Sequence, residues 1–336
     1  MTAQLRSAQV TDLGAIDRLY HEGLSMALTG EGATHPIRLW QMVSRALSSL
    51  LPLATPSEML YVLEEDGRVT GFIQGEILAP ATSAVSRGPV AVRVLNLSLS
   101  PERGASAGGS LIDHLCNQAL ARGVARVYVR IPEGHGVIES FRAQGFQHYA
   151  SDRVLYREDL EGVPAPEPPD GLRPARRQDR LGLFTLYLAS TPRAVSQLEA
   201  PDFAQWRAVY ETEWLNRFGR RPARSLVVDR GEVVAWLGVE PGPPGRPHTL
   251  AFAVRADAAA GGGLHSALLG EAVRQLPPGA IWANVRNYDT LSSRVLQDAG
   301  FTVLAGQDLL VREMRARVAE RARAPKKEKA LAPVFG

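Results

Sequence analysis

Apolar and polar positions alternate along the chain in blocks that recur in the same order. Residues 61–77 and 226–240 each contain two alternating apolar runs around a charged turn with a glycine, which is the pattern of a β-hairpin. Residues 92–115 and 248–269 each pass from an apolar strand pattern through a Gly-rich turn into a helical pattern. These pairs indicate that the second half of the chain repeats the first.

Two further pairs of segments extend the repeat toward the ends of each half. LRSAQVTDLGAI at 5–16 resembles LRPARRQDRLGL at 172–183, and in both a strand-like start precedes an Asp that can N-cap a helix. FRAQGF at 141–146 resembles LQDAGF at 296–301, and each closes a short helix with a Gly before a last strand. Similar segments in one order predict an internal duplication.

The repeat predicts the domain organisation and the fold class. A Pro-rich linker at 161–171 separates an N-terminal domain at 1–160 from a C-terminal domain at 172–316, and a basic tail follows at 317–336. Each domain runs strand, helices, hairpin, strand, Gly-rich turn, helix, strand, helix, strand. We expect an α/β (α+β) fold in which each domain is a mixed, mostly antiparallel sheet flanked by helices.

Composition narrows the classes of function. With 45% hydrophobic and 22% charged residues the chain is globular, and no apolar run approaches the roughly 18 residues of a membrane span. The start of the sequence lacks a signal-peptide pattern, so we expect a cytoplasmic protein with no membrane partner. The single cysteine, Cys116, excludes an internal disulfide and a cysteine-based zinc cluster, and no metal site is expected. The sequence shows no basic face interleaved with aromatic residues, so we expect no nucleic-acid binding.

The Gly-rich turn of the first half has the chemistry of an anion site. Small residues allow a ligand to approach the backbone, and successive amides at a helix N-terminus bind phosphate. No Gly-Lys-Ser or Gly-Lys-Thr follows, so the turn is not a Walker A loop, and it does not match the GxGxxG dinucleotide pattern. Tight packing between strand and helix is the plainer interpretation of such a turn.

The turn resembles the pyrophosphate loop of the GNAT (GCN5-related) N-acetyltransferase family, Gln/Arg-x-x-Gly-x-Gly/Ala. Arg103, Ser106 and Gly108 take the motif positions when the helix register is fixed on its leucines, and Ala107 and Gly109 are the alternatives one step away. The resemblance implies acetyl-CoA as co-substrate, with the fourth strand holding its pantetheine arm. The residues it implies in the first half are Leu97, Leu99, Arg103, Gly104, Ala105, Ser106, Ala107, Gly108 and Gly109.

The second half carries an altered form of the same loop. The register used for the first half places Ala260, Gly263 and His265 at the motif positions, so the arginine is absent and a histidine replaces a glycine. A shifted register would use the three consecutive glycines instead. The candidate binding residues of this half are Val254, Gly261, Gly262, Gly263 and Leu264. We therefore expect the N-terminal domain to bind CoA better.

The resemblance implies transfer of an acetyl group to an amine of a small molecule or peptide. Glu76, at a strand end, is a candidate general base, and Asn96 is a candidate for positioning a water or the acceptor. His135, in a turn near the expected thioester end, is a third candidate. Each also has a plain interpretation: a solvated carboxylate, a satisfied amide in the sheet, and a loop histidine.

The sequence departs from the family at the residue that protonates the leaving thiolate. Many GNAT enzymes have a tyrosine four residues before the Gly of the Gly-Phe pair, where this chain has Phe141 and Leu296. Other phenols, Tyr149, Tyr156 or Tyr288, would have to replace it. Three functions stay open: an N-acetyltransferase laid out like tandem proteins of the mycothiol synthase kind, an acyl-CoA sensor or scaffold, and a duplication without CoA.

Two segments are candidates for binding the acceptor. The first is 31–42. The second is 203–218, where aromatic residues recur every three or four positions and predict an aromatic helix face. Core packing, an acceptor pocket and an interdomain contact all fit such a face.

Overall fold

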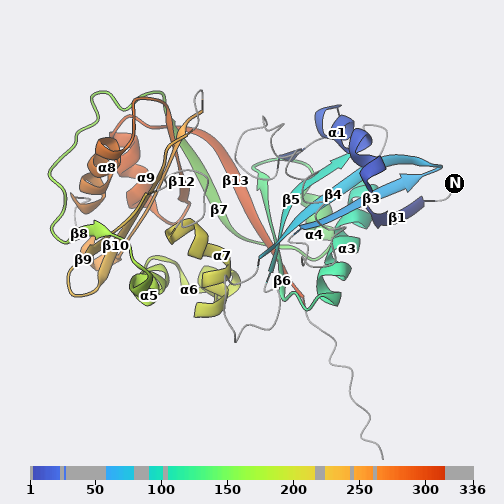
Figure 1. Cartoon of the computed structure of the whole chain (residues 1–336), viewed down its shortest axis with the longest axis horizontal. Helices are drawn as coiled ribbons and strands as arrows, with labels where there is room; N and C mark the ends of the chain where they lie inside the picture. The colour runs from blue at the N-terminus through green and yellow to red at the C-terminus, as the bar shows by residue number, and fades with distance from the viewer. Residues whose placement is uncertain are drawn as a thin grey trace, which may run out of the picture.

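One mixed sheet of thirteen strands runs through both halves of the chain in the computed structural model (Figure 1). The structure describes residues 3–22, 26–27, 58–78, 91–100, 105–215, 224–242, 246–259 and 263–314. The strands of the first half are β1 (Ala3–Ser7), β2 (Met26–Ala27), β3 (Glu58–Glu65), β4 (Arg68–Leu78), β5 (Ala91–Leu99), β6 (Arg126–Pro132) and β7 (Gln147–Arg157). Those of the second half are β8 (Leu172–Pro174), β9 (Arg224–Asp229), β10 (Val233–Glu240), β11 (His248–Val254), β12 (Ile281–Arg286) and β13 (Thr302–Glu313).

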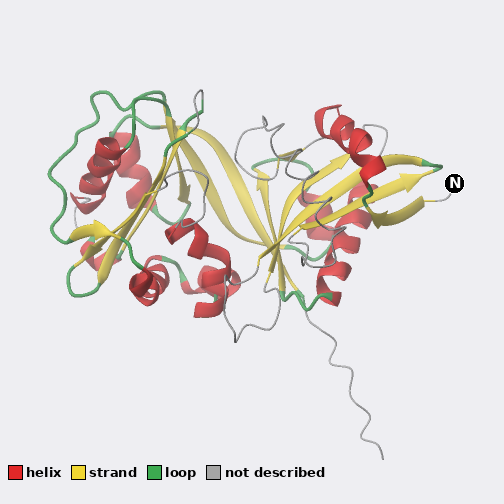
Figure 2. Ribbon diagram, in the orientation of Figure 1, coloured by secondary structure: helices red, strands yellow, loops and turns green. Residues whose placement is uncertain are grey.

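Helices cover both faces of the sheet in each half (Figure 2). In the first half α1 (Leu13–Glu22) packs on one face, and α3 (Ala105–Ala121) and α4 (Ile138–Ala143) pack on the other. In the second half α5 (Arg180–Ser190), α6 (Arg193–Glu199) and α7 (Phe203–Leu215) lie opposite α8 (Gly263–Gln275) and α9 (Thr290–Asp298). The predicted fold class, a mixed and mostly antiparallel sheet flanked by helices, is confirmed.

The start of each half contains an equivalent Arg–Asp ion pair, which matches the repeat in the sequence. Arg6 donates from both terminal nitrogens to Asp12 at 2.6 and 2.9 Å, and Arg173 does the same to Asp179 at 2.7 and 2.8 Å. Each aspartate also accepts the backbone N–H three residues earlier at 2.7 Å, as a capping carboxylate does. Equivalent geometry at equivalent positions supports the duplication.

The last strand of each half completes the sheet of the other half. β13 pairs with β6 of the first half and with β7, while β7 pairs with β12 of the second half. β7 and β13 therefore lie side by side at the centre of the sheet (Figure 1). Asp152 of β7 is in register with Gln307 of β13 near the middle of the molecule, and both side chains are buried. The boundaries 1–160 and 172–316 stay a prediction, but any cut between them divides one sheet.

The Pro-rich linker packs against the second half along α8. It has neither helix nor strand, and its carbonyls at Ala165 and Pro166 accept hydrogen bonds from Arg274 of α8 at 3.3 and 2.8 Å. A Cβ at Gly270 would lie 2.8 Å from the Cδ of Pro166 and 2.9 Å from the Cα of Ala165. A glycine inside α8 thus allows the linker backbone to lie directly on the helix.

Replacing Gly270 with alanine is expected to destabilise the fold by about 1–3 kcal/mol, although alanine favours a helix interior, because the new methyl group overlaps the linker. Urea unfolding followed by circular dichroism measures the change. Gly14→Ala in α1 is the matched control, since no atom lies within 4 Å of its added Cβ, and it should gain about 0.5–1 kcal/mol. Equal gains in both variants would show that the linker does not rest on α8.

Candidate functional site

Two parallel strands diverge in each half and open a V in the sheet. β5 and β6 pair only at Ala91–Arg126, Val92–Val127 and Arg93–Tyr128, although β5 continues to Leu99. We call the diverging arms, residues 94–99 and 129–132, the first V. The second V consists of residues 251–254 and 284–286, beyond the last β11–β12 pair. Diverging strands leave main-chain donors and acceptors on facing edges without each other as partners.

A short strand of the same chain lies on the inner edge of the first V. β2 pairs Met26 with Leu97 and Ala27 with Asn96, while β4 pairs with these two residues on their other edge. The side chain of Leu97 packs in the core with α3, as does that of Leu99 nearer the open end. Leu97 and Leu99 are the two predicted pantetheine contacts. The main chain of Leu97 is already paired with Met26 of β2 along this edge.

The N-terminus of α3 lies at the open end of the first V. Its first turn contains no acidic residue, so none of its own carboxylates there neutralises the positive end of the helix. A Cβ at Gly108 would lie 3.3 Å from Cδ1 of Leu99, and one at Gly109 would lie 3.1 Å from Nε2 of Gln144, the residue that follows α4. Both glycines thus permit close packing of α3. Ala105, Ser106 and Ala107 form the rest of this turn, while Arg103 and Gly104 lie outside the described residues.

The equivalent turn of the second half is filled by rings. His265, in the position of Gly108, is 2% exposed and packs edge-on against Phe252 of β11 with ring centroids 5.7 Å apart. Its Nδ1 has no hydrogen-bond partner in the part of the chain that the structure describes, and burial lowers the pKa of the imidazole despite the charge of Asp289. Leu264 is buried beside it, Val254 ends β11 and Gly263 begins α8. Gly261 and Gly262 lie outside the described residues.

An amide relay connects Asn96 to a carboxylate across three strands. Nδ2 of Asn96 donates to Oε1 of Gln74 at 2.6 Å, and Nε2 of Gln74 donates to Oε2 of Glu58 at 3.3 Å. Glu76 is half-buried one alternation further along β4, in register with Arg93 of β5. The two candidate residues Asn96 and Glu76 thus share one region of the sheet. Sequence reasoning missed Gln74 and Glu58, which carry no motif.

His135 lies apart from these two candidates. It follows the tip of β6 in a turn, half-buried, and its Nδ1 accepts the backbone N–H of Val137 at 3.3 Å. This contact orders the entry to α4. The structure brings Asn96 and Glu76 onto neighbouring strands but leaves His135 beyond the end of the other arm of the V.

Phe141 and Leu296 stand at the positions where a tyrosine is expected, so neither position supplies a phenol. Phe141 is fully buried edge-on against Phe146, with centroids 5.1 Å apart, and Leu296 is fully buried as well. Of the alternative phenols, Tyr156 and Tyr149 are half-buried on β7, Tyr149 at the seam between the halves, and Tyr288 packs near Tyr149. Burial raises the pKa of Tyr149, and raises that of Tyr288 to about 12, so both stay protonated at neutral pH.

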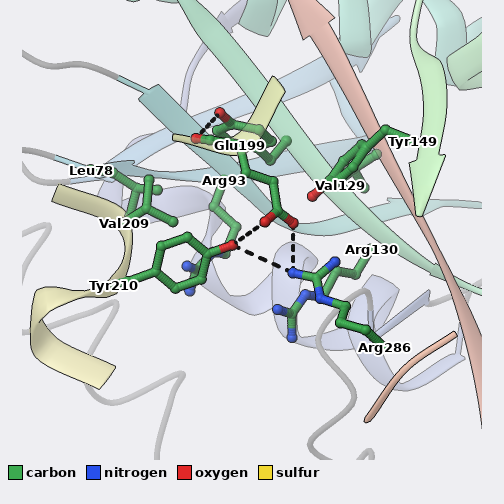
Figure 3. Close-up of a pocket in the computed structure, with 10 residues that line it drawn as sticks. Leu78, Arg93, Val129, Arg130, Tyr149, Glu199, Val209, Tyr210 and Arg286 are labelled. Carbon is green, nitrogen blue, oxygen red and sulfur yellow. Dashed lines mark hydrogen bonds and ion pairs between the residues drawn. The ribbon is translucent and has the colours of Figure 1, made fainter. Parts of the chain in front are cut away.

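A pocket with walls from both halves opens where β5 and β6 begin to diverge (Figure 3). We call it the seam pocket; its volume is about 30 Å³. The first half contributes Leu78, Arg93, Tyr128, Val129, Arg130 and Tyr149, and the second half contributes Glu199, Val209, Tyr210 and Arg286. Its helical wall is formed by α6 and α7, the latter part of the predicted aromatic segment.

The charged groups of the seam pocket centre on Glu199, which is 2% exposed. Its Oε2 accepts from the hydroxyls of Tyr210 at 2.6 Å and Tyr187 at 3.1 Å, and its Oε1 lies 2.6 Å from Nη2 of Arg286. The Nε of Arg286 lies 3.2 Å from Asp152, while its Nη1 has no hydrogen-bond partner among the described residues. Burial and the charge of Glu199 raise the pKa values of both tyrosines, which therefore act as donors.

The aromatic segment serves mainly as core. Trp206 is fully buried among Phe184 and Phe203, whereas Tyr210 turns toward Glu199 in the seam pocket (Figure 3). The side chain of Trp214, all of Phe218 and the other acceptor segment, 31–42, lie outside the described residues. The sequence located this helix face but not the carboxylate that it contacts.

A second hollow lies on the other face of the sheet, between α3 and α4. It has a volume of about 590 Å³ and includes Gly109, Ser110, Ser140 and Gln144 in its wall. It starts beside the first turns of α3, next to the open end of the first V. Asp113 and Glu139 line it as well, so its wall carries two carboxylates.

Metal-ligand groups and membrane-spanning helices are both absent from the residues that the structure describes. No group of three or more His, Cys, Asp or Glu side chains is placed to hold a metal ion within the described ranges. None of the helices described has the length and apolarity of a membrane span.

Comparison with known proteins identifies the fold. No protein-family model matches the sequence, and no curated protein matches it. A GCN5-related N-acetyltransferase from Sphaerobacter thermophilus has a TM-score of 0.56 at 17% identity, over 94% of this chain and 96% of its own. A tandem GNAT protein from the clavulanic acid biosynthesis pathway has a TM-score of 0.54 at 18% identity, over 93% of this chain and 98% of its own. The chain therefore has the fold of tandem GNAT proteins, as the resemblance in its sequence implied.

Proposed function

We propose that the protein is an acyl-CoA-dependent N-acetyltransferase whose working site is the first V. The observation that supports this most is the combination of diverging parallel strands with a helix, α3, whose described first turn has no acidic residue, at their open end. A pyrophosphate bound at that helix end is stabilised by backbone amides and the helix dipole. Arg103 and residues 104–109 would hold it in this proposal.

The length of the first V suits the arm of an acyl-CoA. From Leu99 at the open end to Arg93 at the base, β5 covers about 20 Å at ~3.3 Å per residue. Because β2 pairs with β5 at Asn96 and Leu97, the arm lies on the β6 side of the first V in this proposal and ends near the base, beside the seam pocket. We infer that the acceptor amine enters through the seam pocket, because α3 and α4 cover the opposite face.

The reaction requires an N–C bond to form while the C–S bond breaks, with one proton leaving the amine and one reaching the thiolate. Placing the amine beside the thioester supplies much of the acceleration, since well-oriented reactants gain several kcal/mol. Glu76 accepts the amine proton in this proposal, and Asn96, oriented by Gln74, holds a water on the path. Without a phenol at Phe141, the thiolate takes its proton from solvent.

The second half has a supporting role in this proposal. In the turn of the second V, His265 packs against Phe252 at the position where Gly108 packs closely against Leu99 in the first. One alternative function follows from buried Phe141 and Leu296 at the expected tyrosine positions: an acyl-CoA sensor that binds without turnover.

A charge placed at each helix N-terminus tests the assignment. Ser106→Asp in α3 is expected to weaken acetyl-CoA binding at least about tenfold, or ~1.4 kcal/mol, because the new carboxylate repels the pyrophosphate. The fold should persist, since an acidic residue stabilises the first turn of a helix. Titration calorimetry with acetyl-CoA measures the affinity.

The matched variants are Gly263→Asp at the start of α8 and Gln118→Glu at an exposed position of α3, and both should bind as the wild type does. An affinity lost in Gly263→Asp and kept in Ser106→Asp would move the site to the second half. Absence of acetyl-CoA binding to the wild type would refute the proposal, and binding without release of free thiol for any amine would favour the sensor.

A further inference from the structure

We propose that the seam pocket binds a carboxylate carried by the acceptor, with Arg93 as its main ligand, so that the acceptor is an amine of the amino-acid type. This assignment of the acceptor rests on the proposed function, whereas the carboxylate site itself stands on the charges of the pocket.

The seam pocket contains more positive than negative charge. Arg286 is engaged by both carboxylates, Glu199 at 2.6 Å and Asp152 at 3.2 Å. Arg130 lies 3.9 Å from Asp152. Arg93 is half-buried and has no ion pair or hydrogen bond with any residue that the structure describes. Among the residues that the structure describes, Arg93 is thus a guanidinium of the pocket wall without an ion pair.

The neighbours of Arg93 do not remove this excess. Tyr128, in register with it on β6, is half-buried, and its hydroxyl donates to the carbonyls of Leu198 and Glu199 at 2.8 Å. Glu76, in register on β4, lies beyond ion-pair distance of Arg93. A half-buried cation without a partner is costly, and a bound anion offsets that cost.

The pocket selects among anions by size and shape. A volume of about 30 Å³ accommodates one or two waters or a carboxylate-sized group. A guanidinium fork pairs with a carboxylate through two parallel N–H···O bonds. Arg286 is a further guanidinium in the wall of the same pocket (Figure 3). Leu78 and Val209 form an apolar wall, which suits a small aliphatic side chain next to the carboxylate.

The location connects this subsite to the reaction. Arg93 and Tyr128 form the last pair of strands before the first V opens, so a carboxylate on Arg93 sits at the base of the V. Anchoring the acceptor there directs its amine into the V. Glu76, the proposed base, lies on the strand next to Arg93.

Acetate is the probe for the carboxylate site without acetyl-CoA. Titrating wild type with acetate, against chloride at equal ionic strength, should raise the melting temperature, and Arg93→Ala should abolish the difference between the two salts. Arg93→Lys should keep part of it, since it retains the charge and loses the fork. Arg68→Ala, at an exposed position of β4, is the control and should respond as wild type does. An equal acetate response in wild type and Arg93→Ala would overturn the proposal.

Turnover tests the acceptor class separately. With acetyl-CoA, alanine and 2-aminobutyrate should have kcat/KM values at least about tenfold higher than isopropylamine and sec-butylamine, which lack only the carboxylate. Arg93→Ala should bring each ratio close to one while acetyl-CoA affinity stays unchanged. Equal kcat/KM values for the paired amines in the wild type would refute the assignment of the acceptor class. A wild type that binds acetate but not acetyl-CoA would refute only the proposed function.

Discussion

Replacing Glu199 with glutamine is expected to lower the free energy of unfolding by about 3–5 kcal/mol, the cost of breaking a buried ion pair from one side. The substitution keeps the shape of the side chain but leaves Arg286 with Asp152 alone. It also weakens two charge-assisted hydrogen bonds, from Tyr187 and Tyr210. Because α6 and the end of β12 meet at this contact, both should loosen together.

Urea unfolding of Glu199→Gln and wild type measures this change. Glu139→Gln is the matched control, because Glu139 is 70% exposed in its ion pair with Arg142 and should contribute less than about 1 kcal/mol. The double variant Glu199→Gln/Arg286→Met should recover part of the loss by removing the stranded charge. A loss below about 1 kcal/mol in the single variant would mean that water solvates this contact.

Asp179→Asn should cost about 2–4 kcal/mol at neutral pH, and the cost should shrink in acid. The hydrogen bonds from Arg173 hold the pKa of Asp179 below its usual value near 3.8. A carboxyl whose pKa is depressed by folding contributes stability that is complete above its unfolded pKa, about 3.9. That contribution disappears as the pH falls through the lower, folded pKa. The variant should therefore differ from wild type by a constant amount from pH 7 to about 5 and converge below pH 4.

Asp12→Asn should behave in the same way, because Arg6 lowers the pKa of Asp12 through equivalent hydrogen bonds. Asp257→Asn is the comparison, since its pair with Arg255 is exposed and solvent screens it. The measurement is urea unfolding at a series of pH values. A gap between wild type and Asp179→Asn that widens in acid would contradict the ion-pair account.

Local pattern predicted the elements of this fold, but not how the halves join. The hairpins at 61–77 and 226–240 and the strand–turn–helix units depend on periodicity and turn residues, which short windows of sequence contain. The exchange of β7 and β13 depends on pairing between residues far apart in the chain. Nothing in the last strand of either copy specifies whether its partner is the nearer or the more distant sheet.

The candidate site was found in part for the same reason. Glu76 and Asn96 are recognisable as polar residues on apolar strands, and they lie close together because β4 pairs with β5. Glu199 could not be recognised as a site residue from the sequence, because a carboxylate at the end of a short helix usually faces solvent. Its burial comes from Arg286 and Tyr210, which the fold alone brings to it. Arg93 likewise acquires meaning only when α6 and α7 cover it.

The strand exchange constrains how the chain is synthesised. β6 ends at Pro132 and gains its outer neighbour only when β13, starting at Thr302, has been made. β7 has neither of its neighbouring strands until later in synthesis, because both β12 and β13 belong to the second half. At ~5–20 residues per second this interval lasts on the order of ten seconds or more. During it the nascent first half exposes open strand edges that another copy could pair with, so rapid completion of the chain protects it from aggregation.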